Sequence, residues 1–552
     1  MRKVLLSMLA ISLTMPMFSQ SNVFNAQITE KGFQNPVITG YYPDPSVCRV
    51  GDDFYLINSS FQSFPGVPIF HSKDLIHWEQ IGNVLDRPSQ LDVNGGGPSS
   101  GIFAPTIRYH EGKFYMITTN INSFRTGSGN FIVTADNPAG PWSDPIFIKG
   151  AMGIDPSLFW DEDGRLYLTW SMGGISFVEL DPQTFQMKSE PKTIWEGDGD
   201  SSPEGPHLYK KDGFYYLLIA EGGTEMGHKV TIARSTRIDG PYTSNPANPI
   251  LTQKRMVSSA SLLQGVGHPD LVQAADGSWW MVFLGFRLSA GSFHHVLGRE
   301  TCLAPVRWDE NAWPVVNGKG WVDVDMSHVP TLPQVLMPQA SDYVDFKNGK
   351  KLGFEWIYNH NPIESNYVYA NNQLQLKATS VSLDVADKTP TFVARRQKDI
   401  NCVATTSMSL SNAKAGDRAG LTVYMDNKGH FDLAIVGAAD GSQQVELSYR
   451  LGEMRHVENT VKLSSKGAVQ FRVEATNSHY AFSYSTDGGK SFQPLGKMNA
   501  FFLSTETMGG FTGVLFGWFA EGNEGTKAVA SVDWFDYKPG APYKPVSLYP
   551  TE

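Results

Sequence analysis

The sequence lacks the features that would assign it directly to several large classes of protein. Only three of its 552 residues are cysteines and none stands in a CxxC pair, so neither a zinc cage nor a disulfide framework is indicated. Charged residues make up 18% of the chain and the net charge is −10, without the basic face typical of nucleic-acid-binding proteins. No HExxH, GxSxG, P-loop or dinucleotide fingerprint occurs in a usable context, which argues against metalloprotease, hydrolase-elbow and nucleotide-binding functions.

Long apolar runs are absent beyond the N-terminus. There, Arg2 and Lys3 precede the apolar run 4–17 and polar residues 19–21 follow, which predicts a secretory signal peptide over residues 1–20. The run is short for a bilayer span, and a buried first helix is the alternative. Because no later segment resembles a transmembrane helix and no cysteine lies near the cleavage region, we expect a secreted or periplasmic protein without membrane insertion or a lipid anchor.

Glycine and aromatic residues are plentiful, and a short motif repeats among them. The 53 glycines and 12% aromatic residues are typical of β-structure with many turns. A motif centred on a proline, followed by an apolar aromatic strand, occurs five times, and such a period indicates the blades of a propeller. The prolines of the five copies are Pro45, Pro105, Pro156, Pro206 and Pro269. We therefore predict an all-β chain in which residues 25–325 form a five-bladed β-propeller.

The residues just before these prolines differ between copies. Asp44, Asp155 and, one residue earlier, Glu204 are acids, whereas Ala104 and His268 stand in the other two copies. An Asp-Pro pair alone is usually a turn device, but a propeller brings equivalent corners of its blades together at a central axis. Carboxyl groups in apolar surroundings can divide into a protonated acid and an ionised base. Three acids in one ring therefore indicate acid–base chemistry of the kind that glycoside hydrolysis needs.

The second half of the chain has a different texture. Residues 326–341 carry three prolines without periodicity and are predicted to be a linker. Runs such as 373–377 and 469–473 then alternate apolar and polar side chains, the pattern of strands with one buried face. We expect a β-sandwich of the jelly-roll, concanavalin-like type over residues 342–539, and an extended surface tail over residues 540–552.

Further motifs accompany the repeat and together carry a family resemblance. They are Asn35-Pro36-Val37, Tyr42-Pro43-Asp44-Pro45-Ser46, Ser59-Ser60-Phe61, Phe64-Pro65-Gly66-Val67-Pro68-Ile69, His71-Ser72-Lys73-Asp74-Leu75, Ile102-Phe103-Ala104-Pro105, Ile154-Asp155-Pro156-Ser157, Ser202-Pro203-Glu204-Gly205-Pro206, Gly267-His268, Leu297-Gly298-Arg299-Glu300-Thr301 and Gly353-Phe354-Glu355-Trp356. With them the chain resembles glycoside hydrolase family 43, in the branch of β-xylosidases and α-L-arabinofuranosidases with a C-terminal concanavalin-like sandwich.

The resemblance implies an inverting mechanism with three acids. Asp44 matches the general base that deprotonates the attacking water, and Glu204 matches the general acid that protonates the departing glycosidic oxygen. Asp155 matches the third acid, which orients Glu204 and helps keep it protonated. Inversion predicts a separation of roughly 6.5–9.5 Å between the Asp44 and Glu204 carboxyl groups, which leaves room for the water.

The resemblance also implies residues that bind the sugar. Arg299 matches an arginine that holds sugar hydroxyls and favours ionised Asp44, and a surface ion pair with Glu300 is the alternative. Phe61 and Phe103 match apolar walls of the pocket, with Phe103 standing where many members have tryptophan. Core packing is the alternative for both aromatic residues.

Three further expectations concern a metal, a lid and a thiol pair. The resemblance implies that His268 lies near the propeller axis, where in many members it holds a calcium ion; a purely hydrogen-bonding role is the alternative. Phe511, in the motif 509–513, matches a sandwich residue that closes the far end of the pocket, unless it belongs to the sandwich core. A Cys48–Cys302 bridge between the first and last blades is conceivable, although buried free thiols are the preferred interpretation.

We therefore expect an exo-acting glycosidase that releases terminal β-D-xylose or α-L-arabinofuranose from xylan, arabinoxylan or arabinan oligosaccharides and that requires no cofactor. An endo-arabinanase of the same family is one alternative, but it needs an open groove that a capping sandwich blocks. A non-catalytic carbohydrate-binding propeller is the other, and binding alone does not require the acid pair. The sequence leaves the preferred pentose and the oligomeric state open.

Overall fold

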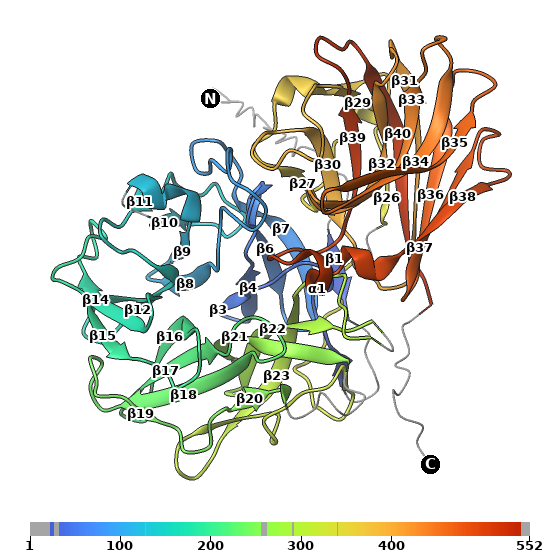
Figure 1. Cartoon of the computed structure of the whole chain (residues 1–552). Coiled ribbons are helices and arrows are strands. Elements are labelled where there is room, and N and C mark those ends of the chain that lie inside the picture. The colour runs from blue at the N-terminus through green and yellow to red at the C-terminus, as the bar shows by residue number, and fades with distance from the viewer. Residues whose placement is uncertain are drawn as a thin grey trace, which may run out of the picture.

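The computed structural model of the chain describes residues 22–26, 32–126, 129–254, 262–289, 292–338 and 341–541. The predicted signal peptide, residues 1–20, and nearly all of the predicted tail lie outside these described residues. Five sheets of four or five strands surround a common centre, and two eight-stranded sheets form a second body beside them (Figure 1). The predicted fold class, a five-bladed β-propeller followed by a concanavalin-like β-sandwich, is confirmed. Among the described residues, no helix has the length and apolar character of a membrane span.

The blades follow one another along the chain, each with its inner strand first. Blade one consists of β3 (Ser46–Val50), β4 (Asp53–Ile57), β6 (Gly66–Ser72), β7 (His77–Leu85) and the N-terminal β1 (Val23–Asn25). Blade two consists of β8 (Thr106–His110), β9 (Lys113–Thr119), β10 (Asn130–Ala135) and β11 (Ile146–Phe147). Blade three consists of β12 (Ile154–Trp160), β13 (Leu166–Ser171), β14 (Ile175–Leu180) and β15 (Lys192–Trp195).

The last two blades repeat this order. Blade four consists of β16 (Glu204–Lys211), β17 (Phe214–Glu221), β18 (Lys229–Ser235), β19 (Thr243–Ser244) and β20 (Leu251–Thr252). Blade five consists of β21 (Leu263–Gln273), β22 (Trp279–Arg287), β23 (Glu300–Trp308) and β24 (Pro314–Val316). The short helical turns within the described residues are η1 (Ile121–Thr126), η3 (Lys347–Gly349), η4 (Glu364–Asn366), η5 (Ala500–Leu503) and α1 (Thr505–Met508).

In four of the five blades, the start of the inner strand is bent at the residue before the proline. Asp44, Asp155, Gly205 and His268 all have left-handed backbone, with φ of 53°, 57°, 60° and 49°. In blades three, four and five the pairing with the next strand also shifts register at this point. An extra residue in one strand bends it and redirects a side chain. The repeated bend therefore points one group from each of these four blades toward the mouth of the ring, at the cost of backbone strain that is common at functional sites.

In four blades the residue after the proline lies at the centre of the ring instead, namely Ser46, Ser157, His207 and Asp270. There Asp270 of blade five accepts hydrogen bonds from the Ser46 hydroxyl of blade one and the Tyr209 hydroxyl of blade four, both at 2.6 Å. The Arg108 guanidinium of blade two lies 2.8 Å from Asp270 Oδ2 and also donates to His207 Nδ1 at 2.8 Å. We call this group the axial cluster; its members are Ser46, Arg108, Ser157, His207, Tyr209 and Asp270. It connects all five inner strands.

The ring is closed by the segment that precedes blade one. The backbone amides of Val37 and Ile38 donate to the Thr301 carbonyl of blade five at 2.9 and 3.2 Å. β2 (Phe33–Gln34) pairs with β25 (Asp325–Met326), so both ends of the propeller segment meet. The predicted linker then lies against blade one, because the Val335 amide donates to Asp74 Oδ2 at 2.8 Å.

The sandwich contains two sheets that enclose one apolar core. One sheet consists of β26 (Tyr343–Asp345), β28 (Tyr367–Ala370), β29 (Gln373–Lys377), β31 (Cys402–Ser411), β36 (Val469–Ala475), β37 (His479–Ser485), β38 (Gln493–Asn499) and β40 (Val529–Pro539). The other consists of β5 (Ser63–Phe64), β27 (Trp356–Asn359), β30 (Thr391–Arg396), β32 (Arg418–Asp426), β33 (Gly429–Gly437), β34 (Gln443–Leu451), β35 (Met454–Lys462) and β39 (Leu515–Glu521). Because β5 belongs to the propeller segment, this sheet joins the two domains.

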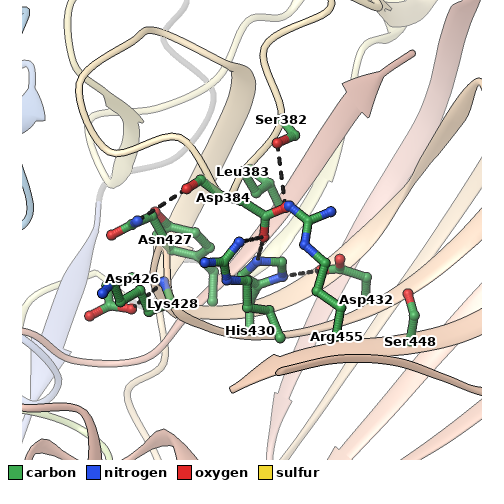
Figure 2. Close-up of polar contacts among 12 residues, drawn as sticks. Ser382, Leu383, Asp384, Asp426, Asn427, Lys428, His430, Asp432, Ser448 and Arg455 are labelled. Carbon is green, nitrogen blue, oxygen red and sulfur yellow. Dashed lines mark hydrogen bonds and ion pairs between the residues drawn. The ribbon is translucent and has the colours of Figure 1, made fainter. Parts of the chain in front are cut away.

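The expectation of one buried face per sandwich strand is wrong for the central strands of the second sheet. Every residue of β33 is buried, because residues 378–390, which we call the strap, cover the outer face. Leu383 of the strap packs on Tyr424 and Phe519. Figure 2 shows that the Asp384 carboxylate contacts Arg455 and the His430 ring, whose Nε2 lies 3.0 Å away.

The three cysteines, Cys48, Cys302 and Cys402, are buried and free, so the interpretation as small buried thiols is confirmed and the Cys48–Cys302 bridge is not formed. Burial raises the pKa of the Cys48 thiol to about 12, because the neutral form is favoured away from water. The thiol is therefore unreactive at neutral pH.

Candidate active site

Asp44 lies at the mouth of the ring with three partners. Its Oδ1 is 3.1 Å from Arg299 Nη1 and 4.0 Å from His268 Nδ1, and its Oδ2 accepts a 2.6 Å hydrogen bond from the Ser59 hydroxyl. Burial alone would raise the pKa of this carboxyl group, but the Arg299 and His268 charges and the Ser59 hydrogen bond outweigh it and lower the pKa. Asp44 is therefore ionised at neutral pH, as a general base must be.

Asp155 is the buried acid of the site, with 6% of its surface exposed. Its Oδ2 accepts a 3.1 Å hydrogen bond from the Gly205 amide, directly after Glu204. Burial, and then the negative charges of Glu204 and Asp44, raises the pKa of Asp155 well above its usual range. The three predicted acids thus lie close enough to influence one another's ionisation.

Glu204 is the most open of the three acids, with 19% of its side chain exposed. It begins β16, and the bulge between Glu204 and His207 directs it to the same mouth as Asp44. His228 Nε2 lies 3.4 Å from Glu204 Oε1. Among the described residues, no other side chain lies within hydrogen-bond or ion-pair distance of this carboxyl group. A solvent-facing acid beside two buried ones is suited to meet a substrate.

Arg299 is buried and faces the site. Its Nη1 contacts Asp44 and also donates to the Thr224 hydroxyl at 2.8 Å. Its Nη2 is buried without a hydrogen-bond partner among the described residues, so this donor is available to a ligand. The alternative pair with Glu300 is not formed, because Glu300 binds Arg287 Nε at 2.7 Å.

The predicted wall residues Phe61, Phe103 and Phe511 meet in one aromatic group. The ring centroids of Phe61 and Phe511 are 5.4 Å apart in a stacked arrangement, and Phe103 meets both edge-on at 5.4 and 5.7 Å. Tyr41 extends the stack behind Phe61 at 5.9 Å. The Arg299 guanidinium carbon lies 4.9 Å from the Phe511 centroid, so the aromatic wall and the acid site are continuous.

Phe511 comes from the sandwich but is fixed to the propeller. Its amide donates to the Ser99 hydroxyl at 2.7 Å, and its carbonyl accepts a hydrogen bond from the Tyr41 hydroxyl. Upstream, the Glu506 carboxylate binds the amide and ring of His295, with Oε1 2.6 Å from Nδ1. The loop therefore lies over the propeller mouth, and Phe511 is not part of the sandwich core.

The groups around His268 do not fit a calcium site. Calcium prefers six to eight oxygen ligands, whereas His268 offers one nitrogen beside Asp44. Among the described residues no group of three or more His, Cys, Asp or Glu side chains could hold a metal. The positive charge at the ring centre is supplied by Arg108 of the axial cluster. We therefore derive no step through a metal.

Several site residues carried no assigned role in the sequence. Ser59 and Tyr41 stand within or beside motifs that were recognised, but a side chain's direction cannot be read from a motif. Thr224 and His228 belong to the turn between β17 and β18, and the pattern Gly222-Gly223-Thr224 was the available signal for a tight turn near the site. The axial cluster had a clearer signal, since a polar residue follows each of the five prolines at the start of a largely apolar strand.

A carboxylate held ionised by an arginine, an open acid beside a buried one, and an aromatic wall to which the second domain contributes Phe511 indicate the class of protein. The class is that of the enzymes that hydrolyse glycosidic bonds, which use a pair of carboxyl groups across a sugar.

Comparisons with known proteins specify the family. Residues 33–314 match the family model Glycosyl hydrolases family 43, and residues 344–538 match the Beta xylosidase C-terminal Concanavalin A-like domain. The non-reducing end alpha-L-arabinofuranosidase BoGH43B of Bacteroides ovatus is 40% identical over 521 residues, covering 93% of this chain and 96% of that protein. A xylosidase/arabinosidase of Butyrivibrio fibrisolvens is 38% identical over 521 residues, covering 89% and 96%.

A solved structure agrees with this assignment over both domains. The structure described as Bacteroides ovatus Xyloglucan PUL GH43B has a TM-score of 0.86 and 38% sequence identity, covering 92% of this chain and 100% of that chain. The chain therefore belongs to glycosyl hydrolase family 43 and is a glycosidase.

Proposed function

We propose that the enzyme is an inverting exo-glycosidase that removes terminal pentoses, β-D-xylose and α-L-arabinofuranose, from oligosaccharides of xylan, arabinoxylan or arabinan. The observation that carries this proposal is the pairing of ionised Asp44 with Arg299, whose guanidinium lies against the Phe511 ring of the sandwich loop. The relatives named an arabinofuranosidase and a xylosidase/arabinosidase support both pentoses.

In the proposed reaction Asp44 takes a proton from a water molecule, whose oxygen attacks the anomeric carbon. Glu204 gives its proton to the glycosidic oxygen, which leaves with the electrons of the broken C–O bond. Asp155 orients Glu204 through the Gly205 amide. The result is one pentose of inverted configuration and a shortened oligosaccharide.

The closed pocket is the reason for proposing exo action. The loop of Phe511 is held by Ser99 and Tyr41 of the propeller, so the chain end of a substrate fits where a continuous polysaccharide does not. The Nη2 of Arg299, which lacks a protein partner among the described residues, is available to a sugar hydroxyl.

The test is hydrolysis of nitrophenyl β-D-xyloside and nitrophenyl α-L-arabinofuranoside side by side, with the first-formed anomer detected by NMR. We expect turnover of at least one pentoside and an inverted first product. A retained anomer rejects the inverting mechanism, and absence of turnover on both rejects the substrate class.

Two substitutions test the roles of the acids. Asp44→Ala and Glu204→Gln should each lower turnover by about 100-fold or more, because each removes one half of the acid–base pair. Unchanged circular dichroism shows that the fold is intact. Full turnover by Glu204→Gln rejects the acid assignment.

We also propose that the protein is secreted or periplasmic and that catalysis needs no bound metal. The apolar run 4–17 after two basic residues supports export. Arg108, which supplies the positive charge at the ring centre, supports the second point. Treatment with EDTA should leave kcat/KM unchanged, and a loss that calcium restores contradicts the proposal.

A further inference from the structure

His228 lies beside the predicted acid in a fully buried position. It precedes β18 and is 1% exposed. Its Nε2 faces Glu204 Oε1 at 3.4 Å and has no hydrogen-bond partner among the described residues. A buried polar atom without a partner is costly, so such an atom in a native protein needs an explanation.

The contact of the other ring nitrogen places one proton of the imidazole. His228 Nδ1 lies 3.2 Å from the Gly265 carbonyl oxygen of β21. Because a carbonyl oxygen only accepts hydrogen bonds, Nδ1 carries the proton. In the neutral ring Nε2 is then an unprotonated acceptor, and its lone pair points toward Glu204.

The ring has little freedom to turn away from the acid. A Cβ added at Gly267 would lie 2.3 to 2.5 Å from ring atoms of His228, so the backbone of blade five packs directly on the imidazole. On the other side, the His228 amide donates to the Glu225 carbonyl at 3.0 Å within the turn that also carries Thr224. The turn thus places both His228 and the partner of Arg299.

A lone pair facing a carboxyl oxygen is favourable only when that oxygen carries a proton. If Glu204 were ionised, its carboxylate oxygen and the Nε2 lone pair would be two acceptors that face each other without a hydrogen between them. The distance of 3.4 Å is longer than a good hydrogen bond, as is common in enzymes without substrate. A small rotation of the Glu204 carboxyl group closes it.

We propose that His228 is a positioning residue for the acid. Its Nε2 accepts a hydrogen bond from protonated Glu204, and this bond keeps the proton on Glu204 between turnovers. When substrate binds, the glycosidic oxygen competes as acceptor, and the carboxyl group turns to present the hydrogen. This inference rests on the proposed role of Glu204 as general acid.

Two variants of His228 separate its two hydrogen bonds. In His228→Asn the amide nitrogen replaces Nδ1 and still donates to Gly265, but no acceptor reaches Glu204. In His228→Gln the longer side chain places an acceptor oxygen near the position of Nε2. Thermal unfolding of both variants, compared with the wild type, shows whether the fold is retained.

The readout is the dependence on the leaving group. Each variant is assayed on a phenyl pentoside, whose leaving group needs protonation, and on the 2,4-dinitrophenyl pentoside, whose leaving group does not. For His228→Asn we expect kcat on the phenyl pentoside to fall about 10- to 100-fold and kcat on the dinitrophenyl pentoside to change little. His228→Gln should recover most of the loss.

Equal losses on both substrates, or no loss on the phenyl pentoside, overturn the proposal. Glu204→Gln, assayed on the same two pentosides, distinguishes a wrong role for His228 from a wrong proposed function. If Glu204→Gln is selectively impaired on the phenyl pentoside and His228→Asn is not, the acid assignment stands and only the role of His228 is wrong. If Glu204→Gln shows no selectivity, the acid assignment itself fails.

Discussion

Asp44 illustrates how the surroundings of one residue set its chemistry. Its carboxyl group is 5% exposed, and in an apolar site of that kind it would be protonated. Arg299 on one oxygen and the Ser59 hydroxyl on the other reverse this effect. The same contacts hold the carboxylate in one orientation, which is what a base that must reach one water molecule requires.

The pH dependence of activity follows from these contacts. In the proposed reaction Asp44 acts as a base only when ionised, so activity should be lost as pH falls through its pKa, which lies below the ordinary 3.8. Replacing Arg299 by Gln removes the largest opposing charge and should move the acidic limb of kcat/KM upward by about one pH unit. Ser59→Ala should move it in the same direction by less. An acidic limb unchanged in both variants would mean that another group controls it.

At this scale the sequence predicted the charged groups better than their partners. Asp44, Asp155 and Glu204 were found because they deviate from a repeat at one equivalent position. Ser59 and Thr224 were not assigned, since hydroxyl groups are common in turns and the pattern does not show which one meets a carboxylate or a guanidinium.

The loop of Phe511 shows how one element couples the two domains. It follows α1, and the contact between His295 and Glu506 anchors its start on blade five. The Val514 amide then donates to the Val296 carbonyl at 3.0 Å, so both ends of the loop are tied to the propeller. A loop fixed at both ends presents Phe511 at little cost in conformational entropy.

Phe511→Ala should weaken substrate binding more than chemistry. The ring stacks on Phe61 and lies over Arg299, and removing such an aromatic contact costs about 1–2 kcal/mol, or roughly tenfold in KM. We expect little change in kcat on a nitrophenyl pentoside. The matched control is Phe501→Ala, which removes a half-exposed ring that stacks on His294. A normal KM in Phe511→Ala would show that the ring lies outside the sugar site.

The strap is an element that the alternation of the sandwich strands could not predict. Alternation reports that one face is apolar, but His430 and Asp432 on the polar face are buried only because Asp384 arrives from another segment (Figure 2). The pairing of charges across distant segments is invisible in a local pattern, which is why the second buried face was missed.

Asp384→Asn should destabilise the sandwich without affecting the active site. The exchange removes one of the two carboxylates that the buried His430 and the largely buried Arg450 each contact, and weakening such a buried network should cost about 2–4 kcal/mol. Calorimetry should therefore show a lower Tm with unchanged kcat/KM. The control is Asp440→Asn, an exposed carboxylate paired with Lys462, which should leave Tm unchanged. An equal Tm in both variants would show that the strap is not held by Asp384.

At the scale of the whole molecule, each repeat supplies two groups with opposite directions. The residue before the proline faces the substrate at the mouth of the ring, and the residue after it faces the axis. The sequence led to the first set because it holds the acids. The second set was missed, although Ser46, His207 and Asp270 occupy the same place in three copies, since polar residues on a strand are usually assigned to solvent.

The axial cluster links the inner strands of the blades through side-chain contacts. Asp270 is fully buried and meets Arg108, Ser46 and Tyr209 from three other blades. Burial would raise its pKa, but the Arg108 charge and the hydrogen bonds from Arg108 and Ser46 lower it to about 2. Burial also lowers the pKa of His207 to about 3, so this ring is neutral and accepts from Arg108. One ion pair, Arg108 with Asp270, therefore lies at the junction of the ring.

The stability of the propeller should depend on this pair. Asp270→Asn leaves Arg108 without its counter-charge and should lower the free energy of unfolding by about 3 kcal/mol. The contribution of Asp270 to the free energy of unfolding depends on pH. Because its pKa is lowered in the folded protein, Asp270 stabilises the fold at pH values above the ordinary pKa of 3.8, and this contribution is lost as the pH falls toward 2. The difference in Tm between wild type and Asp270→Asn should therefore be largest at neutral pH and narrow between about pH 4 and 2.

A double-mutant cycle gives the decisive measurement, because it separates the pair from its surroundings. Arg108→Gln, Asp270→Asn and the double variant are compared by calorimetry at neutral pH. If the guanidinium and the carboxylate act as one unit, the double variant should be less destabilised than the sum of the single variants, by about 1–3 kcal/mol. Strictly additive losses would contradict the coupling, and the ring would then be held together by its blade cores and by the closure at Thr301 alone.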